Sequence, residues 1–177
     1  MPARSEELQQ ALEIPVPDDP SLVLDSSRRL LGPNMYSDQR GAVGDGLSPG
    51  FVPTQVLELW QRHVRALIET LDWRTDIVTR PFDGGASLFI AAPADRLMTA
   101  AYVVEAGWYF TACDLLGRTA IAFDRMASDI AAIASREANP SLVHLLEQAQ
   151  GRGIDQLLDD EAVTLGHGAG GRGGAAG

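Results

Sequence analysis

The stretch that decides the fold is IVTRPFDGGASLFIAAPADRLMTAAYVVEAGWYFTACDLL, residues 77–116. Its first half holds two runs rich in β-forming residues, 77–82 and 86–91, separated by Asp-Gly-Gly at 83–85. Two such runs joined by an aspartate and a glycine pair are typical of a β-hairpin. Because Pro81 has no main-chain N–H, it predicts that the first strand lies at a sheet edge or contains a bulge.

The second half of this stretch predicts the central helix of the core. Pro93 and Asp95 are favoured at a helix start and Gly117 is a typical stop, so we expect the helix to end at Leu116. Apolar side chains occur on nearly every side of this helix, which indicates that it is buried. Glu105 lies near its middle, and a central acidic residue disfavours a membrane-spanning helix.

A carboxylate buried in such a helix is costly unless it has a partner. We therefore expect Glu105 to form a core ion pair with Arg80, with Arg96 or with a residue near them. The alternative is that Glu105 is a ligand-binding acid.

The flanking sequence supplies the other elements of an α+β fold. Residues 54–71 carry apolar side chains at spacings of three and four, which predicts an amphipathic helix. Asn139 followed by Pro140 is typical of a helix start. Further helices are expected at 120–136 and 141–150, and short strands at 21–25, 42–47 and 162–165, the second weakened by its glycines.

These elements predict a small mixed or antiparallel sheet packed against about four helices in a single domain. The expected domain spans residues 21–165. Residues 1–20, with three prolines, are expected to be a flexible leader, and residues 166–177 a glycine-rich tail or linker.

Composition excludes several classes of function. The net charge of -10 makes nucleic acid and membrane surfaces unfavourable partners. All 14 basic residues are arginine, so no lysine is present for a phosphate-binding loop or a Schiff base. The single Cys113 and the absence of a signal-like N-terminus indicate the cytoplasm.

No catalytic or metal motif emerges from the sequence. His63, His144 and His167 lie on separate elements and not at metal-ligand spacing. The glycine-rich sequence at 166–171 matches GxGxxG but lacks the helix that a dinucleotide site requires behind it. Ser87 lacks the second glycine of a nucleophile elbow and is expected to be an ordinary strand serine.

Three arginines, Arg28, Arg29 and Arg40, surround a turn-forming Gly-Pro-Asn in this otherwise acidic chain. Guanidinium groups bind carboxylates with paired hydrogen bonds, so this cluster is a candidate site for an acidic peptide or polymer. The alternative is a solvated set of arginines that stabilises the loop.

Several segments follow one another in an order that carries a family resemblance. They are LDSSRRLLGPNMY at 24–36, RPFDGGASL at 80–88, APADRL at 92–97, EANP at 137–140 and DDEAVTLG at 159–166. Together they resemble the N-terminal domain of cyanophycin-synthetase-like proteins of the Mur ligase family. In such proteins this domain precedes an ATP-dependent ligase body, and in cyanophycin synthetases it helps to hold the aspartate–arginine polymer.

The resemblance implies a ligase context without a catalytic residue, metal or cofactor in this chain. We therefore expect a non-catalytic substrate-holding or scaffolding domain that binds an acidic or zwitterionic peptide or polymer, or a separate ligase subunit. Two alternatives stay open: a small enzyme with a composite site of Glu105 and a histidine, and an interaction module that forms homo-oligomers through its apolar helices. The substrate-binding candidates are Arg28, Arg29, Asn34, Tyr36, Arg40 and Glu105.

Overall fold

The structure of the chain is a computed structural model, and it describes residues 12–154, 156–158 and 163–165. The first part of the predicted leader, residues 1–11, and the predicted tail, residues 166–177, lie outside the described residues. Within the remainder of the leader, Leu12 and Ile14 are partly buried against the hydrophobic core.

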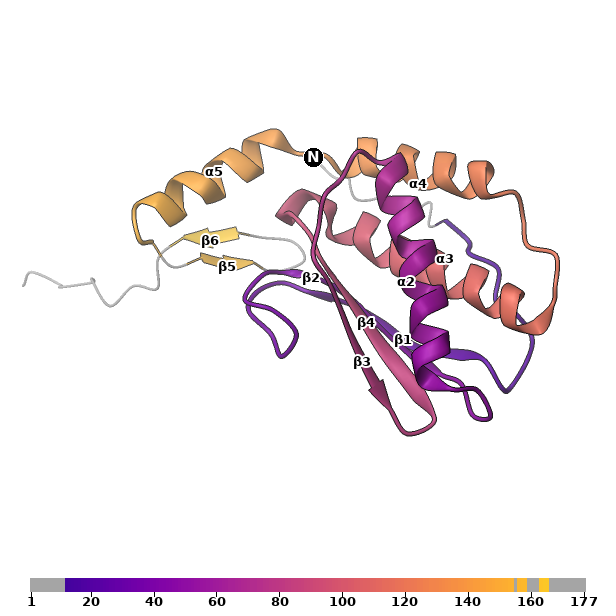
Figure 1. The fold of residues 1–177 in the computed structure, drawn as a ribbon. Coiled ribbons are helices and arrows are strands. Elements are labelled where there is room, and N and C mark those ends of the chain that lie inside the picture. The colour runs from indigo at the N-terminus through magenta and orange to yellow at the C-terminus, as the bar shows by residue number, and fades with distance from the viewer. Residues whose placement is uncertain (1–11, 155, 159–162, 166–177) are drawn as a thin grey trace, which may run out of the picture. The chain divides into compact units, whose positions relative to one another are not determined.

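The chain has the predicted α+β fold, and it divides into two compact units, one ending at Ala138 and one beginning at Asn139. The first unit is built on a four-stranded antiparallel sheet with the strand order β1-β2-β4-β3 (Figure 1). Its strands are β1 (Val23–Leu30), β2 (Gly41–Leu47), β3 (Ile77–Phe82) and β4 (Gly85–Ala91).

The predicted hairpin is confirmed as β3 and β4, and the strand that contains Pro81 lies at the sheet edge as expected. The first strand differs from its prediction, because it continues past residue 25 and includes both Arg28 and Arg29. The second strand forms at its predicted place in spite of its glycines.

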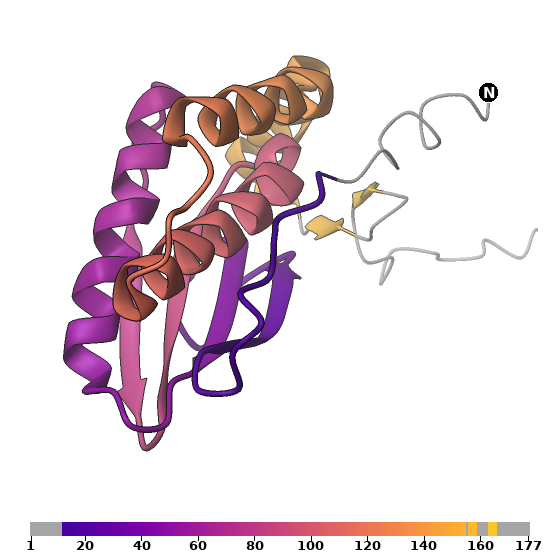
Figure 2. The same cartoon turned by 90° about the vertical axis from the view of Figure 1, so that its right-hand side faces the viewer.

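The helices of the first unit gather on one side of the sheet (Figure 2). Helix α3 contacts β1 and β2, α2 contacts β3 and β4, and α4 packs against α3. Their bounds are α2 (Pro53–Thr70), α3 (Leu97–Leu116) and α4 (Phe123–Glu137), with the short 3-10 helix η1 (Ala94–Arg96) directly before α3. The predicted helices are thus confirmed to within a few residues at their ends.

Both ends of α3 are closed by specific contacts. Gly117 ends the helix in the left-handed conformation with φ of 62°, as predicted, because glycine has no β-carbon to strain there. At the other end, the Glu137 carboxylate accepts hydrogen bonds from Met98 N (2.6 Å), Thr99 N (2.8 Å) and Thr99 Oγ1 (2.6 Å). The last residue of α4 therefore caps the first turn of α3.

Two glycines of β2 make room for two tryptophans of the helices. A β-carbon added at Gly44 would lie 2.6 Å from a Val104 methyl group and 3.0 Å from the Trp60 ring, and one added at Gly46 would lie 2.2 Å from the Trp108 ring. The two indoles meet edge to face with ring centroids 4.8 Å apart. Trp60 is fully buried and donates its indole N–H to the carbonyl of Val104 at 2.9 Å, which ties α2 to α3.

The second unit contains α5 (Pro140–Gly151) and a two-stranded antiparallel sheet of β5 (Gln156–Leu158) and β6 (Val163–Leu165). Asn139 is confirmed as the N-cap of α5, since its side-chain oxygen accepts a hydrogen bond from Leu142 N. The final strand was predicted, whereas its partner β5 was not.

Candidate functional site

The alternation of side chains along β1 separates the two predicted arginines. Arg29 pairs in register with Ala42, and Ser27 pairs with Gly44, on the sheet face that the helices cover. Arg28 pairs with Val43 and therefore points to the opposite face. The predicted cluster of Arg28 and Arg29 is divided between the two faces of the sheet.

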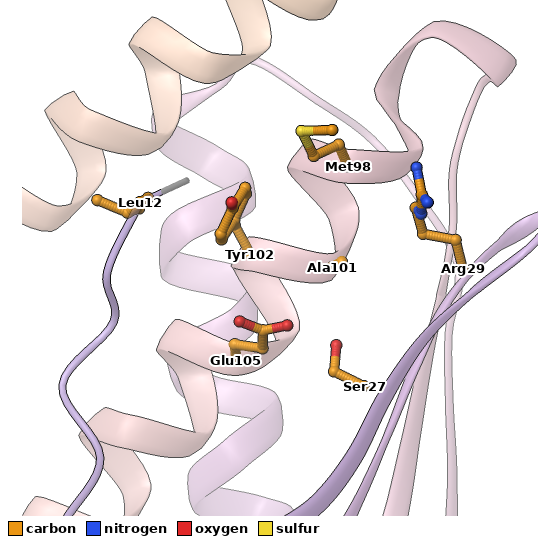
Figure 3. Close-up of a pocket in the computed structure, with 7 residues that line it drawn as sticks. All are labelled: Leu12, Ser27, Arg29, Met98, Ala101, Tyr102 and Glu105. Carbon is orange, nitrogen blue, oxygen red and sulfur yellow. The ribbon is translucent and has the colours of Figure 1, made fainter. Parts of the chain in front are cut away.

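A cavity of about 360 Å³ opens between β1, α3 and the N-terminal segment (Figure 3). Arg29 and Glu105, two residues predicted separately as substrate-binding, both line it. The structure thus brings a cationic and an acidic candidate into one site. The complete lining is Leu12, Ser27, Arg29, Met98, Ala101, Tyr102 and Glu105.

The Glu105 carboxylate is partly buried in this cavity and forms no ion pair with any described residue. Burial raises the pKa of the Glu105 carboxyl above its ordinary value, and the nearby Ser27 hydroxyl offsets part of that effect. The predicted core ion pair is wrong. Arg80 lies on the distant edge strand β3, where it donates a hydrogen bond to the carbonyl of Met35 and covers the Tyr36 ring at 4.9 Å.

Ser27 is the residue of this site that sequence reasoning missed most clearly. Its Oγ atom is buried and has no hydrogen-bond partner among the described residues. Figure 3 shows this hydroxyl facing the Glu105 carboxylate across the cavity. The period of two along β1 could have identified Ser27, because it must share a face with Arg29.

The lining residues of α3 are Met98, Ala101, Tyr102 and Glu105, and their i, i+3, i+4, i+7 pattern places them on one helix face. That spacing is visible in the sequence. It could not be recognised as a site, since nothing in the sequence says that this face meets β1.

The other predicted arginine on β1, Arg28, belongs to a polar network on the open face of the sheet. The Asp45 carboxylate accepts hydrogen bonds from Arg28 (2.6 Å), Ser26 (2.8 Å) and Ser87 (2.6 Å). Burial pushes the pKa of Asp45 upward, but the hydrogen bonds of Ser87 and Ser26 and the Arg28 charge outweigh it, so the pKa lies below its ordinary value. Ser87 is therefore a strand serine, as predicted.

This network predicts a pH-dependent contribution to stability. Because the folded-state pKa of Asp45 is lowered, its contribution is complete above the unfolded value and is lost as pH falls through the folded value. We expect Asp45→Asn to lower the free energy of unfolding at pH 7 by about 1.5–3 kcal/mol, the range for charged hydrogen bonds. Urea unfolding at several pH values should show this deficit shrinking in acid.

Asp38→Asn, a change at an exposed loop aspartate, is the matched control and should leave stability at pH 7 nearly unchanged. If Asp45→Asn and Asp38→Asn were equally stable at pH 7, the network would contribute nothing.

Asn34 and Tyr36 shape the loop that follows β1. The Asn34 side chain accepts hydrogen bonds from Tyr36 N (2.9 Å) and Ser37 N (3.1 Å) and donates to two loop carbonyls. The Tyr36 ring stacks on Phe89 with centroids 5.7 Å apart. Both predicted binding residues are therefore engaged in contacts that hold the loop on the open sheet face.

Arg40, at the end of the same loop, is partly buried, and burial lowers the pKa of its guanidinium. It is not among the residues that line the cavity. Of the six predicted substrate-binding residues, the structure brings only Arg29 and Glu105 together in this cavity.

His63, the histidine of the first unit, does not complete a site with Glu105. His63 lies 2.8 Å from Asp114, which is more than two helical turns beyond Glu105 on α3. His144, in the second unit, is exposed and 2.8 Å from Gln148, and His167 lies outside the described residues. Within the described part of the chain, no cluster of metal-ligating side chains occurs.

No helix among the described residues is long and apolar enough to span a membrane. Comparison with known proteins leaves the site geometry as the basis for any assignment: no family model matches the sequence, and no curated protein is significantly similar to it.

Proposed function

We propose that this chain is a non-catalytic domain that holds an amino-acid or peptide substrate for an ATP-dependent ligase of the cyanophycin-synthetase or Mur type. The observation that carries this proposal is the cavity between β1 and α3, which combines Arg29 and Glu105. A site with charges of both signs suits a zwitterionic ligand, since each end of the ligand meets an opposite charge.

The dimensions and chemistry of the cavity support a holding role. Its volume of about 360 Å³ falls within the range for small-molecule sites. Met98, Ala101 and Leu12 provide apolar walls against which a ligand's methylene groups can pack. The chain has no lysine to contact a nucleotide phosphate, so activation of the substrate would fall to a separate ligase.

Isothermal titration calorimetry with aspartate–arginine peptides tests this function. We expect binding that weakens as salt is added, because charge attraction contributes to it. Arg29→Gln should reduce the affinity by about tenfold, the equivalent of roughly 1.4 kcal/mol. Arg62→Gln, on the exposed face of α2, is the control and should bind like the unchanged protein. Absence of heat with every peptide at all ionic strengths would remove the proposal.

A further inference from the structure

We propose that Glu105 and Ser27 form a cation subsite in the cavity, which receives a protonated amine or a guanidinium group of the ligand. This assignment rests on the proposed function, since it places one end of the same ligand. It adds the chemical class of the group that the subsite accepts and the two residues that bind it.

The first argument is the isolated charge of Glu105. Its carboxylate lines the cavity, is partly buried and forms no ion pair with a described residue. A buried carboxylate is unfavourable until an opposite charge or several donors reach it. A cationic ligand group placed here would supply both, because ammonium and guanidinium groups each carry several N–H donors.

The second argument is the Ser27 hydroxyl, which is buried and has, apart from the nearby Glu105 carboxylate, no polar group among the described residues to pair with. Leaving a buried hydroxyl unpaired costs free energy, so such an atom needs an explanation. The hydroxyl faces Glu105 in Figure 3, and it can accept an N–H from the same cation that the carboxylate binds. Because the hydroxyl and the carboxylate face each other, one cationic ligand group can reach both.

The arrangement of the cavity favours a cation over an anion at this position. Besides Glu105, the polar residues that line the cavity are Ser27 and Arg29 from β1 and Tyr102 from α3, with the apolar Leu12 on the N-terminal segment. Figure 3 shows Arg29 beside Met98 and the Ser27–Glu105 pair at the other end of the site. An anionic ligand group next to Glu105 would meet a like charge.

Proton linkage follows from this geometry. Burial raises the pKa of Glu105, and a bound cation favours the ionised form and must lower that pKa again. Affinity for the cation should therefore fall as pH decreases through the raised pKa and level off above it. Glu105→Gln should abolish that pH dependence, because the amide does not ionise.

Calorimetry with three neutral-backbone probes tests the subsite. N-acetyl-arginine amide and N-acetyl-lysine amide present a guanidinium and an ammonium, whereas N-acetyl-citrulline amide has a nearly identical shape without the charge. We expect at least one cationic probe to bind about tenfold or more tightly than the citrulline compound. Glu105→Gln should remove this preference, and Ser27→Ala should weaken cation binding several-fold. Glu58→Gln, on the exposed face of α2, should change nothing.

The outcomes separate this inference from the proposed function. If aspartate–arginine peptides bind the unchanged protein and Glu105→Gln equally well, the cation subsite is wrong and the holding function stands. If no peptide or probe binds, both fall. Thermal unfolding gives a second readout: Glu105→Gln should be at least as stable as the unchanged protein, since it removes an uncompensated charge. A clear loss of stability would mean that the carboxylate has a structural partner, and it would overturn the subsite.

Discussion

Replacing Gly46 with alanine should lower the free energy of unfolding by about 3 kcal/mol, as overpacked cores do. The new β-carbon would lie 2.2 Å and 2.4 Å from two carbons of the Trp108 ring. That ring cannot move away freely, because it is almost completely buried and packs edge to face on Trp60. Urea unfolding measures the loss directly.

A matched control and a double variant sharpen this test. Gly32→Ala adds the same methyl group where no heavy atom lies within 4 Å of the new β-carbon, so its effect should stay within about 0.5 kcal/mol. In a Trp108→Ala background the added methyl group has room, and Gly46→Ala should cost much less than in the unchanged protein. Equal effects of Gly46→Ala and Gly32→Ala would refute the packing of β2 against α3.

Glu137→Ala is expected to have the second large effect, a loss of about 2–4 kcal/mol in the free energy of unfolding. The substitution removes the acceptor for Met98 N, Thr99 N and the Thr99 hydroxyl, and Thr99 is fully buried. It also removes a negative charge from the positive end of the α3 dipole. Chemical denaturation gives the size of the loss, and amide hydrogen exchange at Thr99 shows its location.

Glu137→Gln keeps one acceptor oxygen and should cost about half as much, because the charge and the second acceptor are lost. Glu69→Ala, at an exposed position on α2, is the control and should leave exchange at Thr99 unchanged. The capping role would be contradicted if amide exchange at Thr99 became faster in Glu69→Ala, or if it did not become faster in Glu137→Ala.

Local signals predicted most elements of this fold. The Asp-Gly-Gly sequence at 83–85, Gly117 and Asn139 each mark a turn or helix end through their own backbone chemistry, and each is found in its predicted role. Pro81 located the edge strand for the same reason. The conformations that these residues favour depend only on nearby residues in the chain, so the sequence alone is sufficient to predict them.

The second strand shows where such reading becomes weak. Gly44 and Gly46 lower the strand propensity of residues 41–47, so the sequence predicts this strand only weakly. Glycine is needed at both positions because a β-carbon there would clash with the rings of Trp60 and Trp108, which come from helices later in the chain. Only the crossing of those helices over the sheet explains why glycine is required.

The sequence predicts individual residues of the candidate site, but it does not predict that these residues come together in one cavity. Glu105 and Arg29 were chosen for their charge and surroundings, and they share a cavity only because α3 lies over β1. The sequence predicts Asn34 and Tyr36 as ligand-binding residues because they lie in a loop near arginines. The structure uses both to build the loop itself.

The central claim is that the Glu105 carboxylate is held partly buried for a cation. The most direct measurement is an NMR pH titration of the Glu105 side-chain carboxyl carbon, with and without N-acetyl-arginine amide. We predict a pKa above the ordinary glutamate value in the free protein and a lower pKa when the probe is bound. An ordinary pKa in the free protein, unchanged by saturating probe, would contradict the account.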